Sequence, residues 1–114
     1  MEYLFIFNDS PYGSQRAYNG LRLAVALAPE AQLRVFLLGD GGTCAAAGLS
    51  PKDADYNPQA MLQTIAAAGH PILACGTCMD ARGLTQETLI PEVHRTTLDQ
   101  LVKWTQEATK VLTF

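Results

Sequence analysis

Short continuous runs of apolar residues recur along the chain and predict β-strands that are covered on both faces. Turn formers such as Pro11, Gly13 and Gly39 follow these runs and end them. The predicted strands are Tyr3–Phe7, Leu33–Leu38, Pro71–Cys75 and Val111–Phe114, with a shorter one at Leu89–Ile90.

Between the strands, apolar residues return every three or four positions, which is the spacing of amphipathic helices. The first predicted helix begins at Ser14, a favourable N-cap, and is ended by Pro29. A second covers Gln59–Ala68 with Gly69 as its stop, and a third covers Thr97–Glu107. The shorter segments expected to be helix or turn are Thr43–Ala47 and Gly76–Gly83.

Strands that alternate with helices pair in parallel through right-handed crossovers, so the pattern predicts a single α/β domain over residues 1–114. We expect a flavodoxin-like three-layer sandwich with a mainly parallel sheet of four or five strands. In such sheets, ligands and reactive groups gather at the carboxyl ends of the strands. The loops that should meet there are Asn8–Gly13, Gly39–Thr43 and Cys75–Gly83.

Composition and charge argue against some classes of function, such as nucleic-acid binding. The chain is 48% apolar and carries a net charge of −3 from eight basic and eleven acidic residues. The basic residues are scattered, so no direct nucleic-acid partner is expected. No apolar stretch approaches the roughly 18 residues of a membrane helix, and nothing resembles a signal peptide, so the expected location is the cytoplasm. A domain of this size has a high surface-to-volume ratio, which favours oligomerisation.

Cys75 is the residue best placed for chemistry, because it ends a predicted strand and precedes Gly76. A helix starting there would point backbone N–H groups at the sulfur, lower the pKa of the thiol and raise its thiolate fraction. Arg82, four residues after Cys78, would bring positive charge to the same face, whereas Asp80 would oppose it. The alternative is an inert structural cysteine, since free cysteine is among the most buried residue types.

Cys78 completes a C-G-T-C motif, whose spacing suits redox, thiol-transfer or metal chemistry in a reducing compartment. A redox pair would cycle between dithiol and disulfide. A zinc site would need two more ligands, and the candidates Cys44, His70 and His94 lack paired ligand spacing, so no metal is expected. No other cofactor is expected either, because Gly39–Gly42 lacks the glycine pattern of a phosphate-binding turn.

Several stretches of the chain together resemble the DsrE/DsrF-like family. They are the opening strand with SPYGS, then LRLAVAL, VFLLGD, YNPQAML, CGTCMDARG and the closing KVLTF. The resemblance covers essentially the whole chain in the order of the family. Its most specific part is the C-x-T-C-x-D-x-R-G stretch. Within the family, the sequence most resembles the small YchN-like branch.

The resemblance implies a flavodoxin-like fold assembled as homotrimers or hexamers. Members related to TusD and DsrE accept sulfane sulfur on a cysteine as a persulfide and pass it to a partner. The corresponding position in this sequence is Cys75, with Arg82 and Gly83 downstream. Cys78 is an addition of the YchN-like branch, and as a resolving thiol it would form a disulfide and release sulfide.

Three functions remain open at this point. The first is a sulfur-transfer or sulfur-carrier protein that holds a persulfide on Cys75, with Cys78 secondary and Arg82 supporting, and that exchanges sulfur with a protein donor or acceptor. The second is a homo-oligomeric binding or scaffold protein in which Cys75 is buried and unreactive. The third is a thiol–disulfide oxidoreductase that uses both cysteines.

Overall fold

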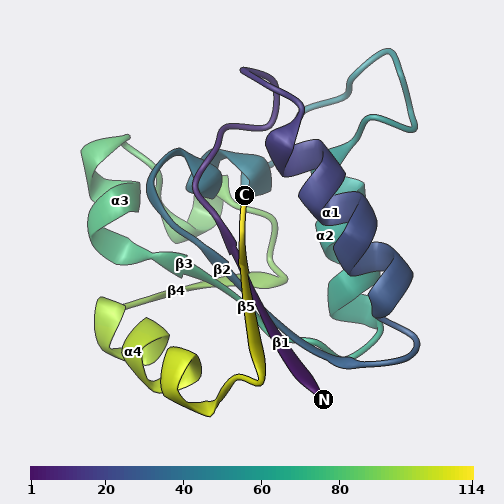
Figure 1. Cartoon of the computed structure of the whole chain (residues 1–114). Coiled ribbons are helices and arrows are strands. Elements are labelled where there is room, and N and C mark those ends of the chain that lie inside the picture. The colour runs from purple at the N-terminus through teal and green to yellow at the C-terminus, as the bar shows by residue number, and fades with distance from the viewer.

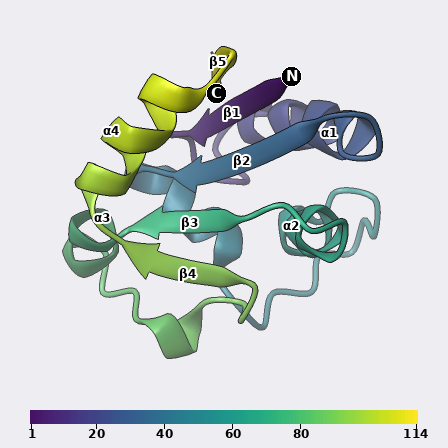
Figure 2. The ribbon, with the colours of Figure 1, turned by 90° about the horizontal axis from the view of Figure 1, so that it is seen from below.

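The computed structural model describes residues 1–114 and contains one five-stranded sheet. All strand pairs are parallel, and the strands lie in the order β4-β3-β2-β1-β5 (Figure 2). The strands are β1 (Glu2–Phe7), β2 (Gln32–Leu37), β3 (Ile72–Cys75), β4 (Val93–Thr96) and β5 (Lys110–Thr113). The helices are α1 (Arg16–Leu27), α2 (Pro58–Ala67), α3 (Gly76–Ala81) and α4 (Leu98–Glu107), with 3-10 helices η1 (Gly39–Ala45) and η2 (Gln86–Thr88).

Helices cover both faces of the sheet, which confirms the predicted α/β sandwich. Helices α1 and α2 lie on one face and α4 on the other (Figure 1). Because successive side chains of a strand point to opposite faces, Phe5 and Phe7 of β1 enter the larger core under α1 and α2. Leu4 and Ile6 of the same strand enter a smaller core with Trp104 of α4. No helix is both long and apolar enough to span a membrane.

The main helices begin and end close to the predicted positions, but the predicted N-cap of α1 was wrong. Asn57 caps α2 by accepting a hydrogen bond from the backbone N–H of Ala60 at 3.2 Å, and Gly69 ends it with a φ of +93°. The prediction that Ser14 caps α1 was wrong. The N-cap of α1 is Gln15, which makes no side-chain capping bond. The hydroxyl of Ser14 donates to Asp9 at 3.0 Å and accepts from the backbone N–H of Arg16 at 3.3 Å.

The strand predicted at Leu89–Ile90 was also wrong. These two residues are buried, and Leu89 forms only an isolated antiparallel bridge with Ala46. The fourth strand is Val93–Thr96, at the edge of the sheet, where only Val93 is buried. His94 therefore lies exposed on β4.

The segment after β2 is more compact than predicted. We expected an exit loop followed by a helix at Thr43–Ala47, but a single 3-10 helix covers Gly39–Ala45. Its start packs tightly on β1, because a side chain at Gly41 would overlap the backbone carbonyl oxygen of Phe7. The glycines of this turn thus bring η1 against the carboxyl end of β1.

Candidate functional site

Cys75 lies where β3 becomes α3. It is the last residue of the strand and the N-cap of the helix, at the carboxyl edge of the sheet. Its side chain points to the face covered by α4 and belongs to the smaller core, and the residue is only 4% exposed. The sulfur is therefore reached only through the cavity that it lines.

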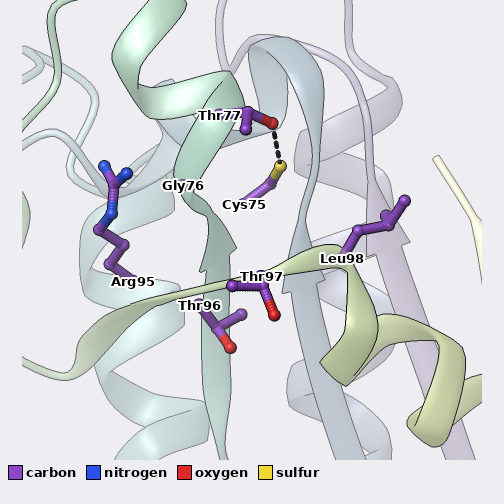
Figure 3. A pocket seen from close by; sticks show the side chains of 7 residues that line it. All are labelled: Cys75, Gly76, Thr77, Arg95, Thr96, Thr97 and Leu98. Carbon is purple, nitrogen blue, oxygen red and sulfur yellow. Dashed lines mark hydrogen bonds between the residues drawn. The ribbon is translucent and has the colours of Figure 1, made fainter.

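Hydrogen bonds to the sulfur of Cys75 favour its thiolate. The hydroxyl oxygen of Thr77 lies 3.3 Å from the sulfur (Figure 3). Burial by itself would raise the pKa of Cys75, but hydrogen bonds from the Thr77 hydroxyl, the Cys78 thiol and the backbone N–H groups of Cys78 and Thr77 outweigh it. The net result is a pKa below the ordinary value of a cysteine thiol, as the position before a helix start predicts.

Cys78 lies in the first turn of α3, and its side chain packs against the smaller core that contains Cys75. Burial and the hydrogen bond that it donates to Cys75 raise the pKa of Cys78, although the Gly39 N–H and the charge of Arg82 act in the opposite direction. The two thiols therefore have different tendencies to ionise, and Cys75 is the one that loses its proton more readily.

The structure places Arg82 beside Cys78 and not over Cys75. Its guanidinium pairs with Asp40 of η1 at 2.8 Å and donates to the backbone carbonyl of Cys78 at 3.0 Å. This ion pair ties the segment after β3 to the segment after β2. The backbone of Asp9, after β1, also accepts a bond from the thiol of Cys44 in η1 at 3.5 Å, so the three predicted loops do lie together.

A second arginine, Arg95, was missed by sequence reasoning. Asp80 of α3 holds its guanidinium through two hydrogen bonds of 2.7 and 2.9 Å, and a methyl group at Gly76 would lie 2.9 Å from the guanidinium carbon. Arg95 lies in β4, and the pairing of Cys75 with Thr96 brings this strand beside β3. The position could have been found only by recognising Val93–Thr96 as a strand.

A cavity of about 320 Å³ opens beside the thiol. It is lined by Cys75–Thr77, from the β3–α3 junction, and by Arg95–Leu98, from the β4–α4 junction (Figure 3). The hydroxyl of Thr97 makes no capping bond to α4, and its side chain is exposed. A small molecule entering this cavity would meet the sulfur, hydroxyl groups and an arginine.

The other candidate ligands and nucleophiles lie elsewhere. Burial, together with the negative charge of Asp9, raises the pKa of Cys44 to about 12, so this thiol stays protonated. His70 bridges two segments of the backbone, accepting from the Leu33 N–H at 3.2 Å and donating to the Ala28 carbonyl at 2.9 Å. No group of three or more His, Cys, Asp or Glu side chains is arranged to hold a metal ion.

Comparison with known proteins gives consistent matches over the whole length. Residues 1–114 match the model of the DsrE/DsrF-like family. Protein YchN of Escherichia coli K12 is 41% identical over 114 residues, which cover 97% of each chain, and the uncharacterized protein MJ0989 of Methanocaldococcus jannaschii is 33% identical over the full length of both. The crystal structure of Escherichia coli YchN superposes with a TM-score of 0.93 at 40% identity, covering 100% of this chain and 99% of the other. The protein of unknown function MTH1491 of Methanobacterium thermoautotrophicum shares the fold, with a TM-score of 0.69 at 15% identity, covering 99% of this chain and 97% of the other.

Proposed function

Because the chain belongs to the DsrE/DsrF-like family, we propose that it is a sulfur carrier that holds sulfane sulfur as a persulfide on Cys75 and passes it to a partner. The observation that carries this proposal is the environment of the Cys75 sulfur, which lines a cavity and has a lowered pKa. A thiolate is the attacking species in sulfur transfer, so the site supplies the form that the reaction needs.

The proposed transfer has two displacement steps. The Cys75 thiolate attacks the sulfane sulfur of a donor, a new S–S bond forms, and the electron pair of the old bond leaves with the rest of the donor. The thiolate of an acceptor then attacks the outer sulfur of the persulfide and releases Cys75 as a thiolate. No oxidant or reductant is consumed. The hydrogen bonds around Cys75 also stabilise it as a leaving group.

Cys78 is the secondary residue of this proposal. Its side chain packs against the smaller core that contains Cys75, so its thiolate could attack the Cys75 sulfur of the persulfide, forming a Cys75–Cys78 disulfide and releasing hydrosulfide. The elevated pKa of Cys78 slows this attack while Cys78 is protonated. Arg82 supports Cys78, since its charge lies beside that thiol.

A thiol–disulfide oxidoreductase is the second candidate. The observation that favours it is the packing of Cys78 against the smaller core that contains Cys75, with each thiol shifting the pKa of the other, because two neighbouring cysteines can be oxidised to a disulfide. The Cys75–Cys78 disulfide would take two electrons from a dithiol substrate, and the reduced pair would then pass them to an oxidant such as another disulfide. This function needs both cysteines at every turnover, whereas sulfur carriage needs only Cys75.

We further propose a homotrimer or hexamer that works in the reducing cytoplasm. The exposed fractions of Leu98 and Val102, one turn apart on α4, are 55% and 51%, and burying them in an interface would remove apolar area from water. All three cysteines are free thiols, the form that a reducing compartment maintains.

Loading with inorganic polysulfide, followed by mass spectrometry of the intact protein and its peptides, tests the proposal. We expect one added sulfur atom on Cys75 in the wild type and in Cys78→Ser, where the persulfide should persist longer. Cys44→Ser is the matched control and should load normally, while Cys75→Ser should not load. Loading that survives in Cys75→Ser would refute the carrier function. An activity that requires Cys78, with a mixed disulfide trapped on Cys75, would favour the oxidoreductase instead.

A further inference from the structure

The cavity beside Cys75 restricts what can deliver sulfur to it. The residue is 4% exposed, and the cavity measures about 320 Å³. A cysteine on the rigid surface of another folded protein would be held outside, because the attack needs the two sulfur atoms in contact. A donor must therefore be small enough to enter the cavity, or be carried at the end of a flexible segment.

The side chains that line the cavity favour a negatively charged ligand. Its side chains include one cation, Arg95, and three hydroxyl groups, from Thr77, Thr96 and Thr97, but no carboxylate. The hydroxyls of Thr96 and Thr97 make no hydrogen bonds with the other lining residues (Figure 3). Hydroxyl and guanidinium groups donate hydrogen bonds, and without a competing carboxylate in the lining they suit an oxyanion as ligand.

Arg95 is held in place and within electrostatic reach of the thiol. Two hydrogen bonds to Asp80 fix the guanidinium against Gly76, and they occupy two of its five N–H groups. The hydrogen bonds that Arg95 donates to Asp80 are the main cause that raises the pKa of Arg95, and the negative charge of the Cys75 thiolate raises it further. Asp80 itself does not line the cavity, so the positive end of this ion pair is the one that a ligand meets.

We infer that this cavity binds a small anionic sulfane donor of the thiosulfate type, with the sulfonate oxygens at Arg95 and the threonine hydroxyls and the outer sulfur directed at Cys75. This inference rests on the proposed carrier function. The Cys75 thiolate forms a bond to the outer sulfur, the S–S bond of thiosulfate breaks, and its electron pair leaves with sulfite. The products are the ionised persulfide and sulfite, so atoms and charge balance without a further reactant.

The first test measures the rates at which two alkylating agents of similar size, anionic iodoacetate and neutral iodoacetamide, modify Cys75. The rates are measured in the native protein and, as a reference, in the unfolded protein. We expect the ratio of the iodoacetate rate to the iodoacetamide rate at Cys75 to exceed that of the unfolded chain. The double variant Arg95→Gln/Asp80→Asn, which removes the ion pair as a unit, should lower the iodoacetate rate about fivefold and change the iodoacetamide rate less than about twofold. Asp80→Asn alone keeps the cation and should not lower the iodoacetate rate. A native ratio equal to that of the unfolded chain would overturn the inference.

The second test separates this inference from the proposed function. Thiosulfate and neutral diallyl trisulfide are each incubated with the wild type, and persulfide on Cys75 is measured by mass spectrometry together with sulfite released. We expect saturable loading by thiosulfate with one sulfite per persulfide, weakened in Arg95→Gln/Asp80→Asn. Loading by the trisulfide alone would refute the anionic donor and leave the carrier function standing. Failure of both donors would count against the carrier function itself.

Discussion

The hydroxyl of Thr77 provides the sharpest test of how the protein activates its thiol. This oxygen lies 3.3 Å from the sulfur of Cys75, and it must donate its proton when the sulfur is a thiolate. Thr77→Val removes the donor and keeps the shape of the side chain. A hydrogen bond contributes about 1 kcal/mol net, and 1.36 kcal/mol corresponds to tenfold in an ionisation equilibrium, so the thiolate fraction at neutral pH should fall about fivefold.

The assay is the rate of alkylation of Cys75 by iodoacetamide as a function of pH. The wild-type rate should rise with pH and level off below the pH expected for an ordinary thiol, because the pKa of Cys75 is lowered. In Thr77→Val the same curve should move to higher pH, with the plateau unchanged. Thr77→Ser retains the hydroxyl and should behave as the wild type. Identical curves for all three, in proteins with equal thermal stability, would refute the claim that this hydrogen bond stabilises the thiolate.

Three further predictions concern stability and the other thiol. Gly41→Ala should reduce the free energy of unfolding by more than about 2 kcal/mol in chemical denaturation, because its methyl group would overlap a backbone carbonyl of β1. Gly42→Ala, where the nearest atom would be 3.6 Å away, is the control and should cost far less; equal losses would disprove the steric reason. His70→Ala should cost about 1–3 kcal/mol through the loss of two backbone hydrogen bonds, whereas the exposed His94→Ala should change stability little. Cys44, whose pKa is raised to about 12 by burial first of all, should resist alkylation in the native protein up to about pH 10 and react only after unfolding, and rapid native labelling would contradict its assignment as a structural thiol.

The order of strands and helices and the position of Cys75 could be predicted from the sequence because both depend on local signals. The apolar runs, the three-and-four spacing of α1 and α2, and breakers such as Gly69 act over a few residues. Parallel strands place all their carboxyl ends at one edge, so the end of β3 had to be near the ends of β1 and β2. Predictions of this kind need no knowledge of distant contacts.

The strand β4 and the residue Arg95 escaped prediction because an edge strand needs little hydrophobic pattern of its own. Only Val93 of its four residues is buried, and its hydrogen bonds come from pairing with β3, which the polar VHRT sequence does not reveal. Without this strand, Arg95 could not be placed beside Cys75. The apolar run at Leu89–Ile90 was mistaken for the strand because it is buried for another reason, in the core beside η1.

Cys75 could be selected as the candidate nucleophile without a structure, since a cysteine at a strand end before a glycine and a helix start is a local arrangement. The charges and hydroxyl groups around it come from distant segments and are known only from the fold. Arg82 follows Cys78 by only four residues, but its guanidinium pairs with Asp40, 42 positions away in sequence. Arg95 instead lines the cavity from the neighbouring strand. Electrostatic interaction depends on distance through space, and the folded sheet sets those distances independently of separation along the chain.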